Sequence, residues 1–325
     1  MQRILIVKTS SLGDVVHNLP VVTDMQRAYG PGHFTVDWVV EEAYADLPRM
    51  HAGVARVLPV ALRRWRKDWL GDAARRERAA FRELLNQQSY DVVLDTQGLM
   101  KSALLARLAR LNPDGLRVGA SWNTVREPLA SLLYHKRFPL DTELHAVERL
   151  RGLAAAALGY PVVGAPDFGL SVAHQPFDWL PHPAYAVLLF ATARSEKRWP
   201  LDHWAVLGRR LAATNTITVL PWGSSNELDT ARKLAEQIPD AIVAPALGLA
   251  SLGALLGGAR VVVGVDTGLT HYAAALGARV VTLFNATPRW QYAPYWSPLA
   301  VSIGDEGAQP GLAQVAGTLQ GLGIL

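Results

Sequence analysis

Short apolar runs alternate along this chain with longer segments of helical periodicity, and this rhythm constrains the fold more than any other feature. The runs predict strands of a parallel sheet, because strands covered by helices on both faces are almost continuously apolar. A first series lies at residues 4–7, 34–40 and 91–96, and a second at 186–190, 216–220, 241–244, 260–265 and 279–284. Helical spacing at residues 15–29 and 76–88 completes βαβ units, and residues 310–323 are compatible with a closing C-terminal helix, so the predicted fold class is α/β.

A proline-rich segment separates the two series. Residues 159–183 contain five prolines, a composition typical of a connection between domains. The chain has 325 residues and half of them are apolar, which is enough for two packed cores. We therefore predict two Rossmann-like, doubly wound α/β domains, at residues 1–165 and 184–325, joined by a linker at residues 166–183.

Composition narrows the setting of the protein. The chain has no cysteine, which excludes disulfides, thiolate nucleophiles and zinc sites with cysteine ligands, and suits a reducing cytoplasm. The apolar run before Lys8 has only four residues, too few for a signal peptide. The uncharged span 241–259 is interrupted by one proline and four glycines, so we expect no transmembrane helix.

Positive charge is concentrated in one segment. Residues 63–82 carry eight Lys or Arg against three Asp or Glu, whereas the whole chain has a net charge of only +4. A local basic segment on a nearly neutral protein predicts a local anionic partner. Nucleic acid, phospholipid and a phosphorylated substrate all satisfy that description.

The first strand ends in a polar turn within ILIVKTSSLGDVVHNLP, residues 4–20. In a doubly wound fold this turn faces the binding crevice, so Asp14 is well placed for chemistry. A dinucleotide fingerprint needs three glycines here, and the turn offers only Gly13. An NAD-dependent oxidoreductase is therefore disfavoured.

A second candidate site lies in VVVGVDTGLTHYAAALG, residues 261–277. A buried strand ends at Asp266 and a helix opens near Thr267 and Gly268, where free backbone N–H groups and the helix dipole favour phosphate. The alternative is that Asp266 and Thr267 only cap the helix. His271 in the first turn either faces a sugar or makes a structural hydrogen bond.

Two further strand ends in the second half carry polar residues. ATARSEKRWP, residues 191–200, offers Thr192 and Lys197, and a lysine here is suited to neutralise a diphosphate leaving group. LPWGSSNELD, residues 220–229, offers Glu227 for ribose hydroxyls. A solvated charged loop and an ordinary first-turn glutamate are the respective alternatives.

The basic segment begins with ALRRWRKDW, residues 61–69. Guanidinium groups bind phosphate bidentately, and tryptophan is suited to a lipid headgroup interface. We expect the cations of this run to bind an anionic group, with solvated surface charge as the alternative. They are Arg63, Arg64, Arg66 and Lys67.

Several common site patterns are missing. The sequence contains no D-x-D triplet, the pair that many nucleotide-sugar enzymes use to hold a divalent metal. It also lacks H-E-x-x-H and a Walker A pattern. We expect neither a metal site nor a cofactor.

Taken together, VKTSSLGDVVHNLP, RRWRK, ATARSEKRWP, LPWGSSNE and VDTGLTH resemble the lipopolysaccharide heptosyltransferases of glycosyltransferase family 9, and within them the type I branch. The resemblance spans residues 3 to about 296. It implies a GT-B fold in which two Rossmann-like domains, the first for the acceptor and the second for the donor, face a central cleft. The implied donor is ADP-L-glycero-β-D-manno-heptose, and the implied acceptor is the first Kdo sugar of Kdo-modified lipid A, at the cytoplasmic face of the inner membrane.

The resemblance also implies roles for individual residues. Asp14 would be the general base, with Ser10, Ser11 and Gly13 beside it at the acceptor. The donor contacts would be Thr192, Lys197, Glu227, Leu247, Asp266, Thr267, Gly268 and His271. Leu247 sits where the family contacts the adenine face, and Lys197 would assist departure of the diphosphate without a metal.

One position departs from the family pattern. Its A-T-T-R sequence has Ala193 here in place of the second threonine, so one phosphate hydrogen bond is either lost or supplied by Ser195. Three alternatives stay open: a nucleotide-sugar-binding regulatory protein without turnover, a related heptosyltransferase with another acceptor, and a nucleic-acid-binding protein that uses residues 63–82. No nucleic-acid recognition motif is visible, so we expect no nucleic-acid partner.

Overall fold

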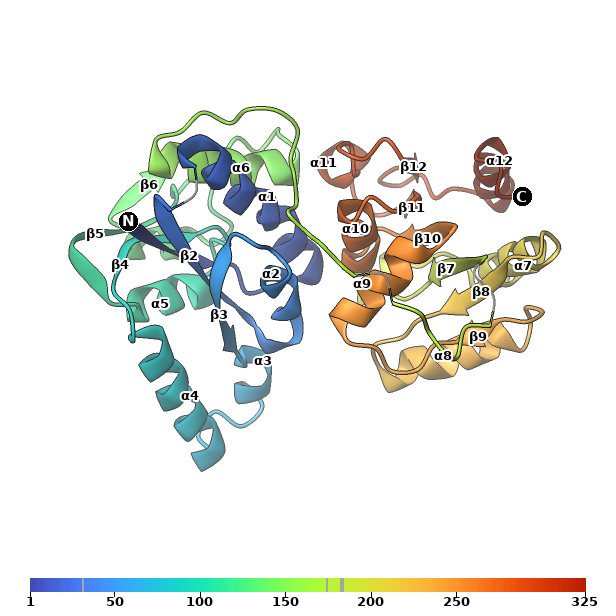
Figure 1. The fold of residues 1–325 in the computed structure, drawn as a ribbon, viewed down its shortest axis with the longest axis horizontal. Coiled ribbons are helices and arrows are strands. Elements are labelled where there is room, and N and C mark those ends of the chain that lie inside the picture. The colour runs from blue at the N-terminus through green and yellow to red at the C-terminus, as the bar shows by residue number, and fades with distance from the viewer. Residues whose placement is uncertain (31, 174, 182–183) are drawn as a thin grey trace. The chain divides into compact units, whose positions relative to one another are not determined.

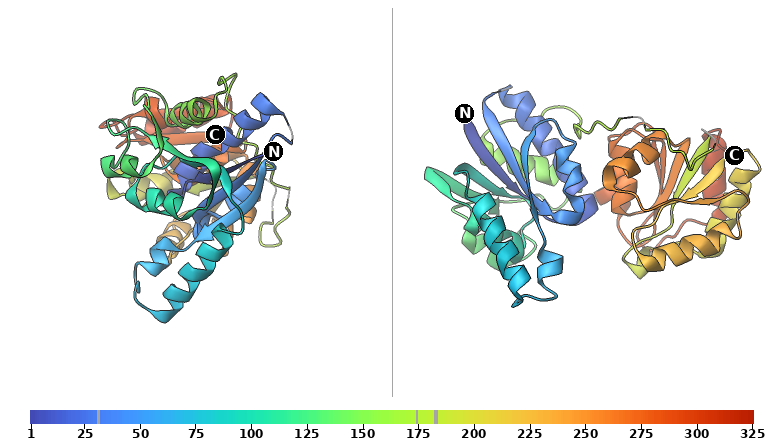
Figure 2. Two further views of the ribbon diagram at one scale, coloured as in Figure 1. Left: turned by 90° about the vertical axis from the view of Figure 1, so that its left-hand side faces the viewer. Right: turned by 60° about the horizontal axis from the view of Figure 1, so that its bottom comes forward.

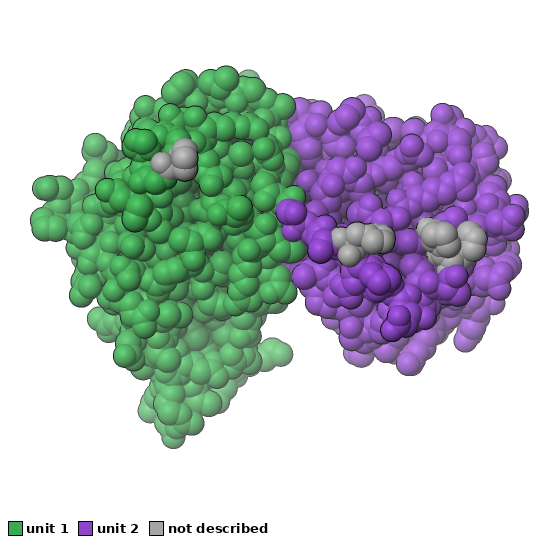
Figure 3. All heavy atoms as spheres, in the orientation of Figure 1, with its two compact units in different colours: residues 1–170 green, residues 171–325 purple. Residues whose placement is uncertain are grey.

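The computed structural model describes residues 1–30, 32–173, 175–181 and 184–325, and it divides into two compact units, Met1–Leu170 and Ser171–Leu325 (Figures 1 and 3). The division falls inside the predicted linker, of which residues 174, 182 and 183 lie outside the described residues. The α/β class predicted from the apolar runs is confirmed in both units.

The first unit contains a six-stranded parallel sheet in the order β3-β2-β1-β4-β5-β6. Its strands are β1 (Gln2–Val7), β2 (Phe34–Glu41), β3 (Val54–Val60), β4 (Tyr90–Asp95), β5 (Leu111–Ala120) and β6 (Lys136–Phe138). Its helices are α1 (Leu12–Tyr29), η1 (Glu42–Tyr44), α2 (Asp46–Arg49), α3 (Leu62–Trp65), α4 (Asp72–Leu85), α5 (Met100–Leu108), η2 (Pro128–Leu133) and α6 (Ala146–Leu158).

The second unit repeats this order in its own sheet, β12-β11-β10-β7-β8-β9, so both units have the Rossmann arrangement 3-2-1-4-5-6. Its strands are β7 (Tyr185–Leu189), β8 (Ile217–Leu220), β9 (Ile242–Val243), β10 (Val261–Val265), β11 (Val280–Phe284) and β12 (Ala300–Gly304). Its helices are η3 (Ser195–Lys197), α7 (Leu201–Ala212), α8 (Ser225–Ala235), α9 (Leu249–Gly258), α10 (Gly268–Ala275), α11 (Arg289–Tyr292) and α12 (Leu312–Gly321).

Helices cover both faces of the first sheet. On one face α4 and α5 pack through Phe81, Leu85 and Leu105 against inward side chains such as Leu5 and Val93. On the other face α1 and α6 lie side by side (Figures 1 and 2). Burial on both faces explains why the strands read as continuous apolar runs.

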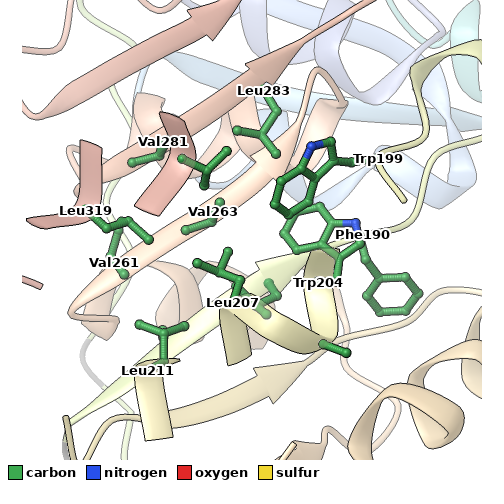
Figure 4. Close-up of a cluster of buried hydrophobic side chains, with 14 of the residues drawn as sticks. Phe190, Trp199, Trp204, Leu207, Leu211, Val261, Val263, Val281, Leu283 and Leu319 are labelled. Carbon is green, nitrogen blue, oxygen red and sulfur yellow. The ribbon is translucent and has the colours of Figure 1, made fainter. Parts of the chain in front are cut away.

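In the second unit, too, a helix packs on apolar side chains at one face of the sheet. Valines and leucines of β10 and β11 meet α7 and a pair of tryptophans (Figure 4). Trp199 and Trp204 contact edge to face, with ring centroids 4.9 Å apart, and the Trp199 indole N–H donates to the Pro310 carbonyl at 2.8 Å. Trp199 therefore anchors the end of the loop that carries Lys197.

Candidate active site

Each sheet has a point at which its strand order reverses, and ligands of open α/β sheets bind there, outside the carboxyl ends of the strands. In the first unit the point lies between β1 and β4, and in the second between β7 and β10. We call residues 8–14 and 95–101 the first-unit site. Residues 191–197, 266–271 and Thr287 form the second-unit site.

Asp14 occupies the first-unit site at the start of α1. Its Oδ2 accepts hydrogen bonds from the Ser11 backbone N–H at 2.7 Å and from the Ser11 hydroxyl at 2.8 Å. This is a capping box, in which Ser11 and Asp14 satisfy the first turn of the helix. The structure thus places Asp14, Ser10, Ser11 and the buried Gly13 together at the switch point, as the sequence predicted.

The loop after β4 binds the loop after β1 and was not singled out from the sequence. The Gln97 side-chain oxygen accepts from both the backbone N–H and the hydroxyl of Thr9, each at 2.7 Å. Ser10 Oγ accepts from Gln97 at 3.2 Å and from Lys101 Nζ at 2.9 Å. The signal was present in the sequence, because QGLMK, residues 97–101, directly follows a predicted strand.

A buried lysine sets the charge of this site. Lys8 is 5% exposed, and its ammonium donates to the Thr96 carbonyl at 3.1 Å. Burial alone would raise the pKa of Asp14, but the charge of Lys8, the Ser11 hydrogen bonds and the charge of Arg126 outweigh it and lower that pKa. Asp14 is therefore held ionised.

Asp95, at the end of β4, is a second carboxyl in the first-unit site and has a structural role. Its Oδ1 accepts from the backbone N–H groups of Gln97 and Gly98, and its Oδ2 accepts from the Tyr134 hydroxyl at 2.7 Å. Burial raises its pKa. These bonds shape the turn after β4, and with it the position of Gln97.

The predicted basic run lies on α3 and the turn that follows it. Arg64 is paired with two carboxylates of the chain itself, Glu42 at 3.0 Å and Glu77 at 2.7 Å. Arg63 lies over the Tyr44 ring, 5.1 Å from its centroid. Arg66 and Lys67 are exposed. The four cations thus differ in how readily they would meet an anion.

Of the two tryptophans in this run, Trp65 is buried and therefore does not offer its ring to a lipid headgroup interface. Trp65 is only 5% exposed, packs edge to face against Phe81, and donates its indole N–H to Glu77 at 2.7 Å. It anchors α3 to α4. Trp69 is the exposed tryptophan of this segment, at 53%, and the Arg78 guanidinium lies 4.2 Å from its ring centroid.

Asp266 is the hub of the second-unit site. Its Oδ2 accepts from Lys197 Nζ at 2.5 Å and from the Thr287 hydroxyl at 2.5 Å, and its Oδ1 accepts from His271 Nε2 at 2.7 Å. Asp266 and His271 are 3% and 4% exposed. The sequence predicted Asp266, Lys197 and His271, and the structure brings them together. Thr287, after β11, was missed.

The protonation state of Asp266 follows from these partners. Burial by itself would raise its pKa, but the hydrogen bond from His271 and the charge of Lys197 outweigh burial and hold the pKa well below the usual range of a carboxyl. Asp266 is therefore a fixed negative charge at the start of α10.

The start of α10 combines two features that suit an anion. Thr267 is the N-cap residue and Gly268 the first helical residue, so the first backbone N–H groups of the helix point outward with the positive end of its dipole. The Thr267 side chain makes no capping hydrogen bond. The capping alternative is thus not realised by the Thr267 hydroxyl.

The remaining predicted donor residues lie in the segments that follow β7, β8 and β9, at the same edge of the sheet. Thr192 follows β7, Glu227 is in the first turn of α8 after β8, and the half-buried Leu247 follows β9. Glu227 accepts from the Gly223 backbone N–H at 2.7 Å, while its own N–H donates to Ser224 at 3.4 Å, so it takes part in capping α8. All three follow the carboxyl ends of parallel strands.

Residues 1–30, 32–173, 175–181 and 184–325 contain no group of three or more His, Asp or Glu side chains placed to hold a metal ion. Within the same part of the chain, no helix has both the length and the apolar character needed to cross a bilayer.

Comparison with solved structures defines the class of protein. Structures of the Escherichia coli heptosyltransferase WaaC, one with ADP and one with ADP-2-deoxy-2-fluoro heptose, give TM-scores of 0.86 and 0.82 at 40% and 41% identity. Each comparison covers 99% of this chain and 98% of the other. The two doubly wound units are therefore those of a GT-B glycosyltransferase.

Sequence comparison identifies the family. The family model for glycosyltransferase family 9, the heptosyltransferases, matches residues 78–316. Lipopolysaccharide heptosyltransferase 1 of Escherichia coli K12 is 46% identical, covering 88% of each chain, and that of Pseudomonas aeruginosa is 45% identical, covering 88% of this chain and 79% of its own. The chain belongs to glycosyltransferase family 9.

Proposed function

We propose that this protein transfers L-glycero-D-manno-heptose from ADP-heptose to the first Kdo of Kdo-modified lipid A, in the synthesis of the lipopolysaccharide inner core. The observation that carries the proposal is the cluster of Lys197, Asp266, His271 and Thr287 at the start of α10. It supplies fixed charges and a helix end at a switch point, which is what a nucleotide diphosphate sugar requires. Relatives named lipopolysaccharide heptosyltransferase 1 support heptosyl transfer in lipopolysaccharide synthesis, and the WaaC structure with ADP-2-deoxy-2-fluoro heptose supports the donor.

In this proposal the second unit, residues 184–325, binds the donor. Lys197, Thr192 and the N-terminus of α10 hold the diphosphate, Glu227 binds the ribose, and Leu247 contacts the adenine. Asp266 binds heptose hydroxyls, since a carboxylate has about four acceptor sites and three are used within the protein. Cationic and helix-end groups take the place of a metal ion at the departing ADP.

The first unit, residues 1–165 in our division, binds the acceptor. Asp14 takes the proton of the acceptor hydroxyl as its oxygen bonds to the anomeric carbon and the bond to ADP breaks. One displacement inverts the anomeric centre, so the β-linked donor gives an α-linked product without a covalent intermediate. Ser10, Ser11 and Gly13 surround the hydroxyl, and Arg63, Arg64, Arg66 and Lys67 meet acceptor carboxylates and phosphates. The acceptor is anchored in lipid, so the enzyme works at the cytoplasmic face of the inner membrane.

The test is a heptosyl-transfer assay with purified protein, ADP-heptose and Kdo-modified lipid A, in EDTA. We expect ADP release and an α-linked heptose on the first Kdo, at a rate unchanged by the chelator. Donor binding without ADP release would favour the regulatory alternative, and transfer to a different acceptor would favour the related heptosyltransferase. Loss of turnover in EDTA that magnesium restores would contradict metal independence.

A further inference from the structure

Helix α5 carries an exposed stripe in which cations and leucines alternate. Lys101, Leu104, Arg107 and Leu108 are exposed, and their spacing of three, four and seven residues places them on one face of the helix. Leu104 is 53% exposed and Leu108 is 42% exposed. The opposite face is buried and packs on the sheet. The leucines of the stripe therefore have no role in the core.

The short helix η2 extends this apolar surface. Leu129 and Leu132 are 58% and 60% exposed, and their spacing matches the three-residue turn of a 3₁₀ helix. The neighbouring Ala130 and Leu133 turn inward and pack in one cluster with Ala103 of α5. The inner faces of α5 and η2 thus hold the two helices together, and their outer faces present four leucines. We call these four leucines with Lys101 and Arg107 the α5–η2 face.

The surroundings of the α5–η2 face are positively charged. Residues 101–137 contain seven Lys or Arg and only two Asp or Glu. Arg107, Arg126 and Lys136 are exposed. On the same side of the sheet α4 adds further arginines of the basic segment. An apolar patch rimmed by cations matches the surface of an anionic bilayer, which offers acyl chains beneath a layer of negative charge.

The α5–η2 face is continuous with the first-unit site. Lys101 begins the stripe, and its ammonium donates at 2.9 Å to Ser10, the residue directly before the capping Ser11–Asp14 pair. Glu127, just before η2, accepts from the Met100 backbone N–H at 2.6 Å and donates its own N–H to the Gly98 carbonyl. A bilayer held on this face would therefore lie next to the acceptor residues.

We propose that the α5–η2 face docks the protein on an anionic phospholipid bilayer, with the four leucines at the level of the acyl chains and the surrounding cations among the headgroups. The inference rests on the proposed function, which explains why the protein would dock. A lipid-anchored acceptor could then reach Ser10 and Asp14 without leaving the membrane. The cations of residues 63–67 bind the acceptor itself, whereas the α5–η2 face binds the bulk lipid.

The experiment measures binding of the full chain to vesicles that contain no acceptor. Vesicles of phosphatidylglycerol and phosphatidylethanolamine are compared with vesicles of phosphatidylcholine in a flotation assay. We expect binding to the anionic vesicles only. The double variant Leu129→Gln/Leu132→Gln should lower the partition coefficient by about tenfold or more, since apolar burial contributes to such docking. Arg107→Gln/Lys136→Gln should lower it by roughly fivefold per charge at low salt.

The matched control is Leu201→Gln/Leu299→Gln in the second unit, because both leucines are 47% exposed. It should bind vesicles like the unchanged protein. Equal loss in the control, no loss in Leu129→Gln/Leu132→Gln, or no binding of the unchanged protein would overturn the proposal. A fall from dimer mass to monomer mass in Leu129→Gln/Leu132→Gln would also overturn the proposal, because the α5–η2 face would then bind a second copy of the chain.

Failure of the docking face and failure of the proposed function are distinguishable. Transfer to a de-acylated, water-soluble Kdo acceptor should be unchanged within about twofold in Leu129→Gln/Leu132→Gln, since neither leucine is placed in the catalytic or binding machinery. If the protein binds vesicles through this face but transfers no heptose, the proposed function is contradicted and the docking proposal is not.

Discussion

The two units share one strand order and each has an aspartate at its switch point, yet the two carboxylates are held in opposite ways. Asp266 has both oxygens engaged by Lys197, His271 and Thr287. Both hydrogen bonds to Asp14 end on Oδ2, and within the described part of the chain Oδ1 accepts none. The same fold therefore presents one closed carboxylate and one open one.

This difference assigns the chemistry. A carboxylate that three donors stabilise in its charged form is a poor proton acceptor and a good electrostatic anchor. An ionised carboxylate with an open oxygen at the start of a helix can receive a proton from a hydroxyl. The comparison therefore supports our proposal that Asp14 is the base and that Asp266 positions Lys197 and His271 for the donor.

The largest expected effect comes from Asp14→Asn. The side-chain oxygen of asparagine can still accept the hydrogen bond from the Ser11 backbone N–H, so folding should be preserved, but an amide cannot take the acceptor proton. We expect kcat to fall by about 10²-fold to 10⁴-fold, with the affinity for both substrates retained. Turnover, melting temperature and ADP-heptose affinity are measured together. Near-normal turnover in a well-folded Asn variant would remove Asp14 as the base and make Asp266 the next to test.

The second effect comes from removing one of the three partners of the closed carboxylate, Asp266. Lys197→Ala removes the cation from Asp266 and from the leaving diphosphate, so kcat/KM for the donor should fall by about 10²-fold. Arg194→Ala is the matched control, because Arg194 lies in the same loop but is exposed and paired with Glu196. A change of less than about threefold in Lys197→Ala, or an equal loss in Arg194→Ala, would show that the loop is only a charged surface.

The third effect separates the cations of the basic run. Arg66 and Lys67 are exposed, so Arg66→Gln/Lys67→Gln should raise KM for the acceptor by about tenfold at low salt and leave donor affinity unchanged. Arg64→Gln should have a smaller effect, because Arg64 is already neutralised by Glu42 and Glu77. Steady-state kinetics at two salt concentrations test both. An equal loss of donor affinity would mean that the run does not serve the acceptor.

The sequence predicted the strands that are apolar and long, because burial on both faces leaves a continuous signal. It did not reveal β3, β5, β6 or β12. β5 contains Pro113 and Gly115, which indicate a turn, and β6 has only three residues. In both cases pairing with a neighbouring strand overrides the local preference.

The candidate site was predictable where polar residues directly follow a strand, as at Asp14 and Asp266. Thr287 and Gln97 also follow strands, but their importance lies in what they contact, and no local pattern specifies a partner 21 or 88 residues away. Trp65 shows the converse. Its neighbours are charged, which suggested an exposed position, but packing against Phe81 buries it.

The smallest effect concerns Lys8, which sets the charge state of the open carboxylate. The pKa of Asp14 is lowered, with Lys8 the main charge responsible and Arg126 a lesser one, so the base stays ionised as the pH falls. Lys8→Met removes that charge and should raise the pKa of Asp14. The acid limb of the kcat profile should then move to higher pH, while turnover well above the limb changes by only a few fold.

Lys101→Met is the control for Lys8→Met, because it removes a neighbouring ammonium that contacts Ser10 but is not among the main causes of the lowered pKa of Asp14. Its acid limb should stay in place even if its acceptor KM rises. The pH dependence of kcat for both variants, with their melting temperatures, decides the matter. The acid limb could instead stay fixed in Lys8→Met, or move equally in Lys101→Met. Either result would mean that the group that titrates in turnover is not Asp14. The contrast between the open and the closed carboxylate would then not explain catalysis.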